Sequence, residues 1–260
     1  MADRKTAVVT GSSSGIGLGV ATAFVEAGYN VAVNARKLTP EVEGIIADLK
    51  TKGEGDVIFA QGDMADRVAC RTMIEGVAGQ FGAVDVLVNN AGVQHVEAID
   101  SFPDEKWDQI IAINLSSAFF TTKAALPGMK KKGWGRVINM ASAHGLVASA
   151  YKSAYVASKH GIMGLTKVTA LETAEMGITA NTICPGYVWT PLVAKQIPEQ
   201  AKAHQMSEDQ VIRDVLLSNQ PNKKFATVEE IGAIAVFLSS DGAASITGAT
   251  ISVDGGWTAR

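Results

Sequence analysis

The sequence has few of the features that mark nucleic-acid binding, membrane insertion or metal binding. Its formal net charge is only -3, so it offers no broad basic surface to nucleic acid. No stretch approaches the roughly twenty apolar residues that cross a bilayer, and the apolar run near the N-terminus is too short for a signal peptide. The two cysteines, Cys70 and Cys184, have no CxxC or histidine spacing that would suggest a metal or redox pair. We therefore expect a soluble, cytoplasmic protein without a metal.

The chain also lacks internal repeats and low-complexity linkers, so its 260 residues are predicted to form one domain, residues 1–260. Short β-branched runs alternate with longer amphipathic segments, as in βαβ units. The predicted strands are 6–10, 30–35, 56–61, 84–91, 135–142, 178–184 and 250–256, and the predicted helices are 15–28, 66–82, 107–132, 153–176 and 228–239. This alternation predicts a single doubly wound Rossmann-type α/β domain with a seven-stranded parallel sheet.

One segment interrupts the alternation. Residues 190–225 are polar, helical in places and inserted before the last helix and strand. Long insertions at the carboxyl edge of such sheets commonly act as lids, and a structural cap or a subunit contact is the alternative. We expect a helical lid insertion at about 190–225.

A glycine-rich turn follows the first predicted strand and opens the first helix. Its glycines are Gly11, Gly15 and Gly17, and they permit close backbone approach, so that a pyrophosphate can rest on the helix N-terminus. The second strand ends without the acidic residue that binds a free ribose 2′-hydroxyl. Arg36 follows instead and, taken alone, favours NADP, unless it is a solvated loop residue. Asp63 and Met64 end the third strand, where they could frame an adenine ring.

The stretch 141–159 gathers hydroxyls and cations but contains no carboxylate. Tyr155 and Lys159 lie four residues apart on a predicted helix, so they project from one face. A phenol with a pKa of about 10 is a poor base at neutral pH unless a positive charge such as that of Lys159 stabilises its anion. A nearby carboxylate would oppose this effect. Ser142 ends the preceding strand, at the edge where ligands of such sheets bind.

In order along the chain, the motifs TGSSSGIG, NNAG, YVASK and PG, with Asn114 and Ser142, resemble those of the short-chain dehydrogenase/reductase family over essentially the full length. The resemblance implies that Tyr155 is the general acid/base and that Ser142 hydrogen-bonds the reacting oxygen. It also implies that Lys159 holds the nicotinamide ribose and lowers the Tyr155 pKa, and that Asn114 kinks its helix and holds a water of the proton relay. The cofactor residues it implies are Gly11, Ser13, Gly15, Ile16, Gly17, Arg36, Asp63, Met64, Asn90, Gly92, Tyr155, Lys159, Pro185, Gly186, Val188 and Thr190.

Two further donors, His144 and Lys152, are not required for hydride transfer. They suggest a substrate with an anionic end, because a buried carboxylate needs a cation or several donors. The alternative is a solvated lysine and a histidine bonded to backbone. With Gln94 and Gln196, these residues resemble the carboxylate pocket of the bacterial D-3-hydroxybutyrate dehydrogenases within the family. The implied substrate-binding set is Gln94, Ser142, His144, Lys152, Tyr155, Gln196 and Trp257.

That closer resemblance implies interconversion of (R)-3-hydroxybutyrate and acetoacetate with NAD, under a closing lid. It also implies a homotetramer built on paired long helices, with Trp257 in a neighbouring subunit's pocket. Two departures keep an alternative open: Arg36 suits NADP, and Trp189 stands where an arginine is expected. The alternative is an NADP-dependent reductase of 3-oxoacyl thioesters. A nucleotide-binding protein without turnover is a third hypothesis, which the complete set of catalytic residues disfavours.

Overall fold

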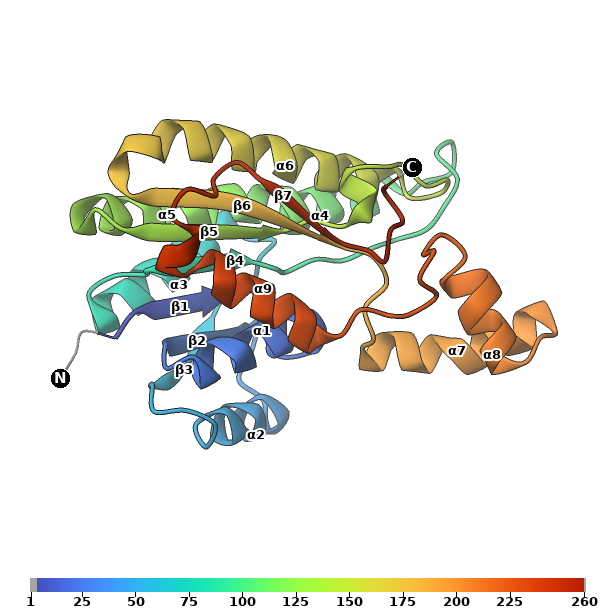
Figure 1. Cartoon of the computed structure of the whole chain (residues 1–260), viewed down its shortest axis with the longest axis horizontal. Coiled ribbons are helices and arrows are strands. Elements are labelled where there is room, and N and C mark those ends of the chain that lie inside the picture. The colour runs from blue at the N-terminus through green and yellow to red at the C-terminus, as the bar shows by residue number, and fades with distance from the viewer. Residues whose placement is uncertain (1–3, 260) are drawn as a thin grey trace.

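The computed structural model describes residues 4–259, in which seven parallel strands form one sheet in the order β3-β2-β1-β4-β5-β6-β7 (Figure 1). The strands are β1 Thr6–Val9, β2 Asn30–Ala35, β3 Val57–Gln61, β4 Val86–Asn89, β5 Gly135–Met140, β6 Ile178–Pro185 and β7 Thr250–Val253. The α-helices are α1 Gly15–Glu26, α2 Pro40–Leu49, α3 Arg67–Phe81, α4 Asp104–Ile111, α5 Ser117–Lys132, α6 Ser153–Thr173, α7 Pro191–His204, α8 Glu208–Gln210 and α9 Val228–Leu238. Short π-helical segments (η1 Ala112–Ser116, η4 Val211–Leu216) and 3-10 turns (η2 Ala143–Gly145, η3 Ala174–Met176, η5 Asp241–Ala243) complete it.

Most strand residues are apolar because both faces of the sheet are covered. Successive side chains of a strand point to opposite faces. Val8 and Leu87 accordingly enter the core beneath α3 and α5, whereas Val9 and Val88 enter the core beneath α1 and α9. The predicted doubly wound parallel fold is thus confirmed.

One helix of the fold was not predicted from the sequence. α2 begins immediately after Thr39, whose hydroxyl accepts a hydrogen bond from the Val42 amide at 3.4 Å, and Pro40 occupies its first turn. A threonine cap followed by proline is a recognised start signal, so this helix could have been found.

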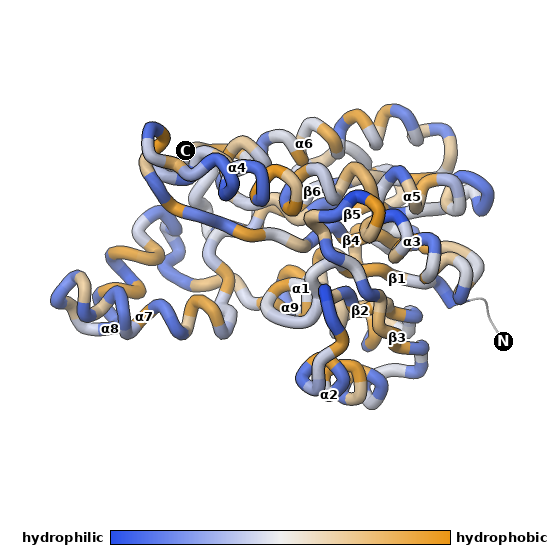
Figure 2. The backbone as a smooth tube through the Cα atoms, turned by 180° about the vertical axis from the view of Figure 1, so that it is seen from behind, coloured by the Kyte–Doolittle hydropathy of each residue, from blue (hydrophilic) through white to orange (hydrophobic). Residues whose placement is uncertain are grey.

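The inserted segment folds as a helical arm beyond the carboxyl edge of the sheet (Figure 1). Its helices α7 and α8 and the segment η4 enclose a small apolar cluster of their own around Ile197, Val211 and Leu216. Figure 2 shows the consequence for the sequence pattern: apolar residues concentrate along the strands, whereas hydrophilic and hydrophobic stretches alternate through α7 and α8.

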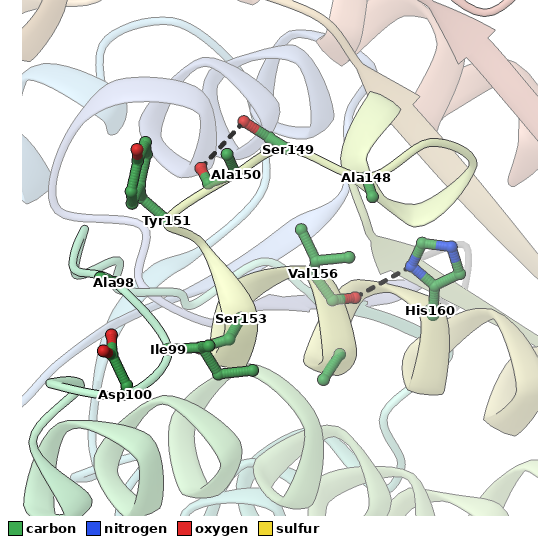
Figure 3. A pocket seen from close by; sticks show the side chains of 11 residues that line it. Ala98, Ile99, Asp100, Ala148, Ser149, Ala150, Tyr151, Ser153, Val156 and His160 are labelled. Atoms are coloured by element: carbon green, nitrogen blue, oxygen red, sulfur yellow. Dashed lines mark hydrogen bonds between the residues drawn. The ribbon is translucent and has the colours of Figure 1, made fainter.

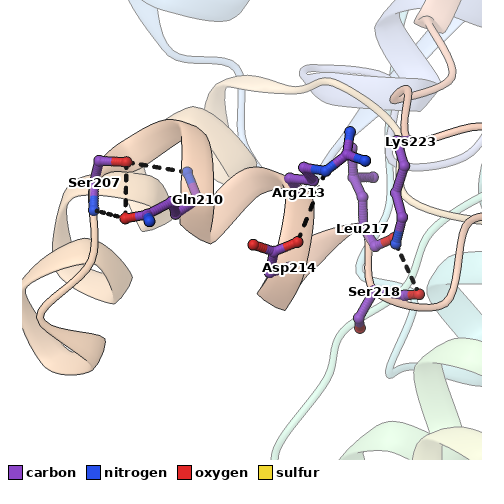
Figure 4. Close-up of polar contacts among 7 residues, drawn as sticks. All are labelled: Ser207, Gln210, Arg213, Asp214, Leu217, Ser218 and Lys223. Atoms are coloured by element: carbon purple, nitrogen blue, oxygen red, sulfur yellow. Dashed lines mark hydrogen bonds and ion pairs between the residues drawn. The ribbon is translucent and has the colours of Figure 1, made fainter.

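Local polar contacts fix the turns of this arm (Figure 4). Ser207 and Gln210 form a reciprocal capping box at the start of α8. Further on, the Lys223 ammonium donates to the carbonyls of Leu217 at 2.8 Å and Ser218 at 3.0 Å. These bonds satisfy the last carbonyls after η4, where the helix ends.

The longest helical run in the described part of the chain is Asp104–Lys132, which combines α4, η1 and α5. By length and composition alone it is long and apolar enough to span a membrane, although the sequence predicts no membrane-spanning segment. Ala125 and Met129 of this run are buried beneath the sheet, beside α3. The run therefore packs as a core helix of the domain.

The buried carboxylate of Asp85 provides a test of the packing at the amino ends of the strands. Asp85 is 3% exposed, accepts a hydrogen bond from the Thr6 amide at 2.8 Å and pairs with Lys132 at 2.8 Å. We expect Asp85→Ala to lower the free energy of unfolding by about 2–4 kcal/mol, because it leaves a buried donor and a cation without partners.

Asp48 is the matched control, since it pairs with Lys52 at the same 2.8 Å but is 61% exposed. Asp48→Ala should change stability by no more than about 0.5 kcal/mol. Urea unfolding of both variants makes the comparison, and equal losses would contradict the role given to Asp85.

Candidate active site

The predicted catalytic side chains come together at the carboxyl edge of the sheet. Ser142 follows β5, and its hydroxyl accepts a hydrogen bond from the His144 amide at 3.2 Å and lies 3.4 Å from the ring Nδ1. Tyr155 and Lys159 lie one turn apart on α6. The Lys159 Nζ lies 5.5 Å from the centroid of the Tyr155 ring and donates to the Met140 carbonyl at 2.7 Å.

Burial dominates the protonation of this group. It raises the pKa of Tyr155, and a hydrogen bond to Ser142 only partly offsets the rise, while nearby Cys184 and Tyr187 add to it. Burial also lowers the pKa of Lys159 to about 8. The phenol is therefore neutral at neutral pH. The lowering of its pKa by the charge of Lys159 stays a prediction.

The two extra donors lie beside this group. Burial, with a smaller contribution from the charge of Lys152, lowers the pKa of His144 to about 4, so its ring is neutral at neutral pH. Burial also lowers the pKa of Lys152. Within residues 4–259 neither Lys152 nor Lys159 is paired with a carboxylate. The cluster is therefore suited to an anionic ligand that supplies the missing negative charge.

Asn114 lies in the π-helical segment η1, at the point where α4 passes into α5. Its side chain accepts a hydrogen bond from the Val93 amide at 2.8 Å and donates to the Val93 carbonyl at 2.9 Å. A longer contact of 3.4 Å joins it to the Ser158 hydroxyl. Asn114 thus connects the loop after β4 to the helix that carries the tyrosine.

The glycine-rich turn has the shape and the free donors that a pyrophosphate requires. Gly11 and Gly15 have φ of +63° and +53°, in the left-handed region that favours glycine. A Cβ on Gly17 would lie 2.4 Å from both the Gly11 carbonyl oxygen and the Asn90 side-chain nitrogen. No side chain caps α1 at Ser14, so the first-turn N–H groups remain available to an anion. A dinucleotide fits this turn.

The other predicted cofactor residues also lie at the carboxyl edge of the sheet. Arg36 is exposed after β2, and Asp63 caps the turn after β3 through the Ala65 amide at 2.9 Å, with Met64 buried beside it. Thr190 reaches the glycine turn: its methyl group lies 3.7 Å from the point where a Gly15 Cβ would stand. The remainder are Ser13 and Ile16 at the start of α1, Gly92 after β4, and Pro185, Gly186 and Val188 at and after the end of β6.

Not every predicted substrate residue lies in the cluster. Lys152 immediately precedes α6, next to the catalytic turn of that helix. Gln94, in the loop after β4, and Gln196, on α7, are both exposed and make no hydrogen bond to Ser142 or His144. The sequence could not place them, because their positions depend on a loop and on the helical arm.

Trp257 contacts the site residue His144 of its own chain, and its place in a neighbouring subunit's pocket stays a prediction. Its ring meets that of His144 edge-on, with centroids 5.1 Å apart. The turn that carries it is closed by Asp254, which accepts hydrogen bonds from the amides of Gly256 at 3.0 Å and Thr258 at 2.9 Å. The C-terminal segment thereby folds back over the carboxyl edge.

Sequence reasoning missed one further aromatic side chain. Tyr187, two residues after β6, stacks on Trp257 with centroids 6.0 Å apart and an interplanar angle of 9°. Burial raises the pKa of its phenol, so it stays neutral. Its position directly after the Pro185–Gly186 turn was the available signal.

A groove of about 720 Å³ lies beside the first turns of α6 (Figure 3). Its lining includes Ile99, Tyr151, Ser153, Val156 and His160. None of the predicted catalytic or substrate residues contributes to this groove, so it is separate from the active site.

Within the described residues, no group of three or more histidine, cysteine, aspartate or glutamate side chains is arranged to hold a metal ion. Cys70 and Cys184 are both buried and form no disulfide.

Comparison with known proteins agrees with this geometry. Residues 5–201 match the family model described as short chain dehydrogenase, and the chain belongs to that family. Its cofactor is accordingly a nicotinamide dinucleotide, and its substrate is a small molecule.

Two relatives span the whole chain. A D-beta-hydroxybutyrate dehydrogenase of Rhizobium meliloti is 56% identical over 256 residues, covering 98% of this chain and 99% of the relative. A D-beta-hydroxybutyrate dehydrogenase of Cupriavidus necator is 53% identical and covers 100% of both chains. A 3-oxoacyl-[acyl-carrier-protein] reductase of Staphylococcus aureus is 36% identical over 97% of each chain.

The buried neutral His144 makes stability depend on pH. Its pKa is about 4 in the folded protein against an ordinary value of 6.5, so the unfolded chain binds more protons between these values. The contribution of His144 to stability is therefore complete above pH 6.5 and is lost as the pH falls toward 4. We expect His144→Asn to reduce the slope of unfolding free energy against pH in this window. Urea unfolding at several pH values measures it, and an unchanged slope would contradict the assignment.

Proposed function

We propose that the protein is an NAD-dependent dehydrogenase that interconverts (R)-3-hydroxybutyrate and acetoacetate. The observation that carries the proposal is the pairing of the catalytic hydroxyls of Ser142 and Tyr155 with the cation and donor of Lys152 and His144, without a carboxylate. Such a site binds a small molecule with an alcohol at one end and an anion at the other. The names and full-length similarity of the two relatives support the same substrate.

The chain contributes binding, orientation and proton transfer. The substrate oxygen lies between Ser142 and Tyr155. In reduction the neutral Tyr155 phenol donates its proton to this oxygen, and in oxidation Tyr155 accepts the alcohol proton after its own proton has left through the relay. Ser142 donates a hydrogen bond to the oxygen as it becomes a carbonyl. Lys159 holds the nicotinamide ribose, and Asn114 completes the proton relay. The nicotinamide ring, when bound, supplies the hydride acceptor. Fixed orientation and this preset polar field lower the barrier.

The other end of the substrate is held by charge and enclosed by aromatic rings. Lys152 and His144 bind the carboxylate, and Trp257 with Tyr187 forms an apolar wall. The 190–225 arm acts as a lid that brings Gln196 to the carboxylate, which Gln94 in the loop after β4 also binds. Leu192, near the start of α7, is 68% exposed, which supports a face that becomes covered on closure.

The proposal extends to the assembly and location of the chain. The chain forms one domain over residues 1–260 and a homotetramer in the cytoplasm. Phe119 on α5 and Val168 and Leu171 on α6 support subunit contacts through the long helices, because these large apolar side chains are all exposed in the single chain.

The test of the proposed function is steady-state reduction of NAD and, separately, of NADP by the purified protein. Each enantiomer of 3-hydroxybutyrate and an uncharged ester of the R form serve as substrates. We expect NAD reduction with the R acid alone. Preference for NADP or for the ester would overturn the proposal, make Arg36 a cofactor residue and favour a reductase of 3-oxoacyl thioesters.

Lys152→Ala separates substrate binding from cofactor binding. Removing the cation leaves the substrate carboxylate unpaired in the pocket, so the KM for 3-hydroxybutyrate should rise at least about thirtyfold. The dissociation constant of NADH, measured by fluorescence, should change by less than about twofold because binding energy is lost only at the substrate.

Lys167, an exposed lysine on the same helix, provides the control. Lys167→Ala should leave both constants unchanged. Equal losses of substrate and cofactor affinity in the Lys152 variant would rule out its role at the carboxylate.

A further inference from the structure

Asn34 in β2 is a buried polar side chain to which the hydride chemistry gives no role. It is 1% exposed, yet all its side-chain hydrogen-bonding groups have partners. Its Oδ1 accepts a hydrogen bond from the Gly11 amide at 2.9 Å. Its Nδ2 donates to the carbonyls of Ala60 at 2.9 Å and Gly62 at 3.2 Å.

The main chain of Asn34 reinforces these contacts. Its amide donates to the Ser12 hydroxyl at 2.9 Å, and its carbonyl accepts from the Ser12 amide at 3.2 Å. The Ser12 hydroxyl in turn donates to the Val9 carbonyl at 2.7 Å. One residue thus joins the glycine turn, β2 and the exit of β3.

The bond to Gly11 fixes the residue at which the turn changes direction. Gly11 enters the left-handed region with φ +63°, and its carbonyl faces the Asn90 side-chain nitrogen at 3.3 Å. Without Asn34, the Gly11 amide would be a partly buried donor with no partner, and other turn conformations would compete. The carboxamide is required because it accepts one bond and donates two, whereas a carboxylate cannot donate.

We propose that Asn34 is a positioning residue that holds the phosphate-binding turn in its binding-ready conformation before the dinucleotide arrives. It touches neither the substrate nor a reacting atom. The effect is pre-organisation: the apparent dissociation constant rises in inverse proportion to the fraction of protein in the competent state. The end of β2 has no carboxylate for the adenosine ribose, so affinity depends more heavily on this turn. The proposal rests on the dinucleotide site of the family, not on the identity of the alcohol.

Asn181 in β6 offers a matched control. It is also 1% exposed, its Oδ1 accepts from the Ala249 amide at 3.0 Å and its Nδ2 donates to the Ile246 carbonyl at 2.6 Å. These partners lie in the segment that leads into β7, and β6 itself is four positions from β2 in the sheet order. Truncation of either asparagine leaves a main-chain amide and carbonyl without partners, so both variants suffer a similar kind of destabilisation.

The experiment compares Asn34→Ala with Asn181→Ala in the full chain, by calorimetric titration with ADP-ribose and by amide hydrogen exchange. We expect the dissociation constant for ADP-ribose to rise about tenfold in the Asn34 variant, as it does if about one-tenth of the protein keeps the competent turn. Exchange in residues 10–17 should be faster in the free Asn34 variant and should slow again with ADP-ribose. Asn181→Ala should change neither the dissociation constant for ADP-ribose nor the exchange in residues 10–17.

Asn34→Thr covers the case in which the alanine variant fails to fold. Threonine suits a strand and keeps one hydroxyl, but cannot accept from Gly11 and donate to both carbonyls. It should show the same changes to a smaller degree. Unchanged ADP-ribose affinity in the Asn34 variants, or an equal loss in Asn181→Ala, would overturn the proposal. ADP-ribose lacks the nicotinamide ring and takes no part in hydride transfer, so the result does not depend on the substrate assigned above.

Discussion

Parallel strand pairing is the constraint on which the site depends. Because all seven strands run in one direction, the loops that leave their carboxyl ends meet at a single edge. Ser142 after β5, Asn90 after β4 and the glycine turn after β1 therefore lie along one line although they are far apart in the sequence. The chain reverses its direction of winding at β1 and β4, and a ligand crevice forms at such a switch point. The first turns of α6, which carry Tyr155 and Lys159, lie at this edge.

The electrostatics at that edge depends on the absence of a carboxylate from the site. Burial favours neutral forms, and it moves the pKa values of Tyr155, Lys159 and His144 in the directions that reduce charge. A carboxylate within the site would hold both lysines charged but would also occupy the place of the substrate anion. Its absence leaves the free site short of negative charge. Binding of a hydroxy acid supplies that charge. Substrate binding is therefore linked to the protonation of the catalytic group.

Much of this could be predicted from the sequence, and the failures have physical reasons. Strand and helix periods predicted the sheet, because both faces of most strands are buried and most of their residues are apolar. Local motifs predicted Tyr155 and Lys159, since four residues on a helix determine a shared face. Trp257 and Tyr187 could not be paired from sequence, because their contact depends on the fold of the C-terminal turn. At the end of the second strand the sequence shows only that an acidic residue is missing, because the bonds of Asn34 to three segments depend on the fold.

The central claim is that Tyr155 transfers the substrate proton. The most direct measurement is the single-turnover rate of NAD reduction by Tyr155→Phe with (R)-3-hydroxybutyrate, with ADP-ribose affinity measured on the same preparation. The account predicts a loss of rate of about a thousandfold, the scale of a general acid/base, with ADP-ribose affinity unchanged within about twofold. A rate within about tenfold of the unmodified protein would contradict it, because removal of an essential general acid/base costs at least about a hundredfold.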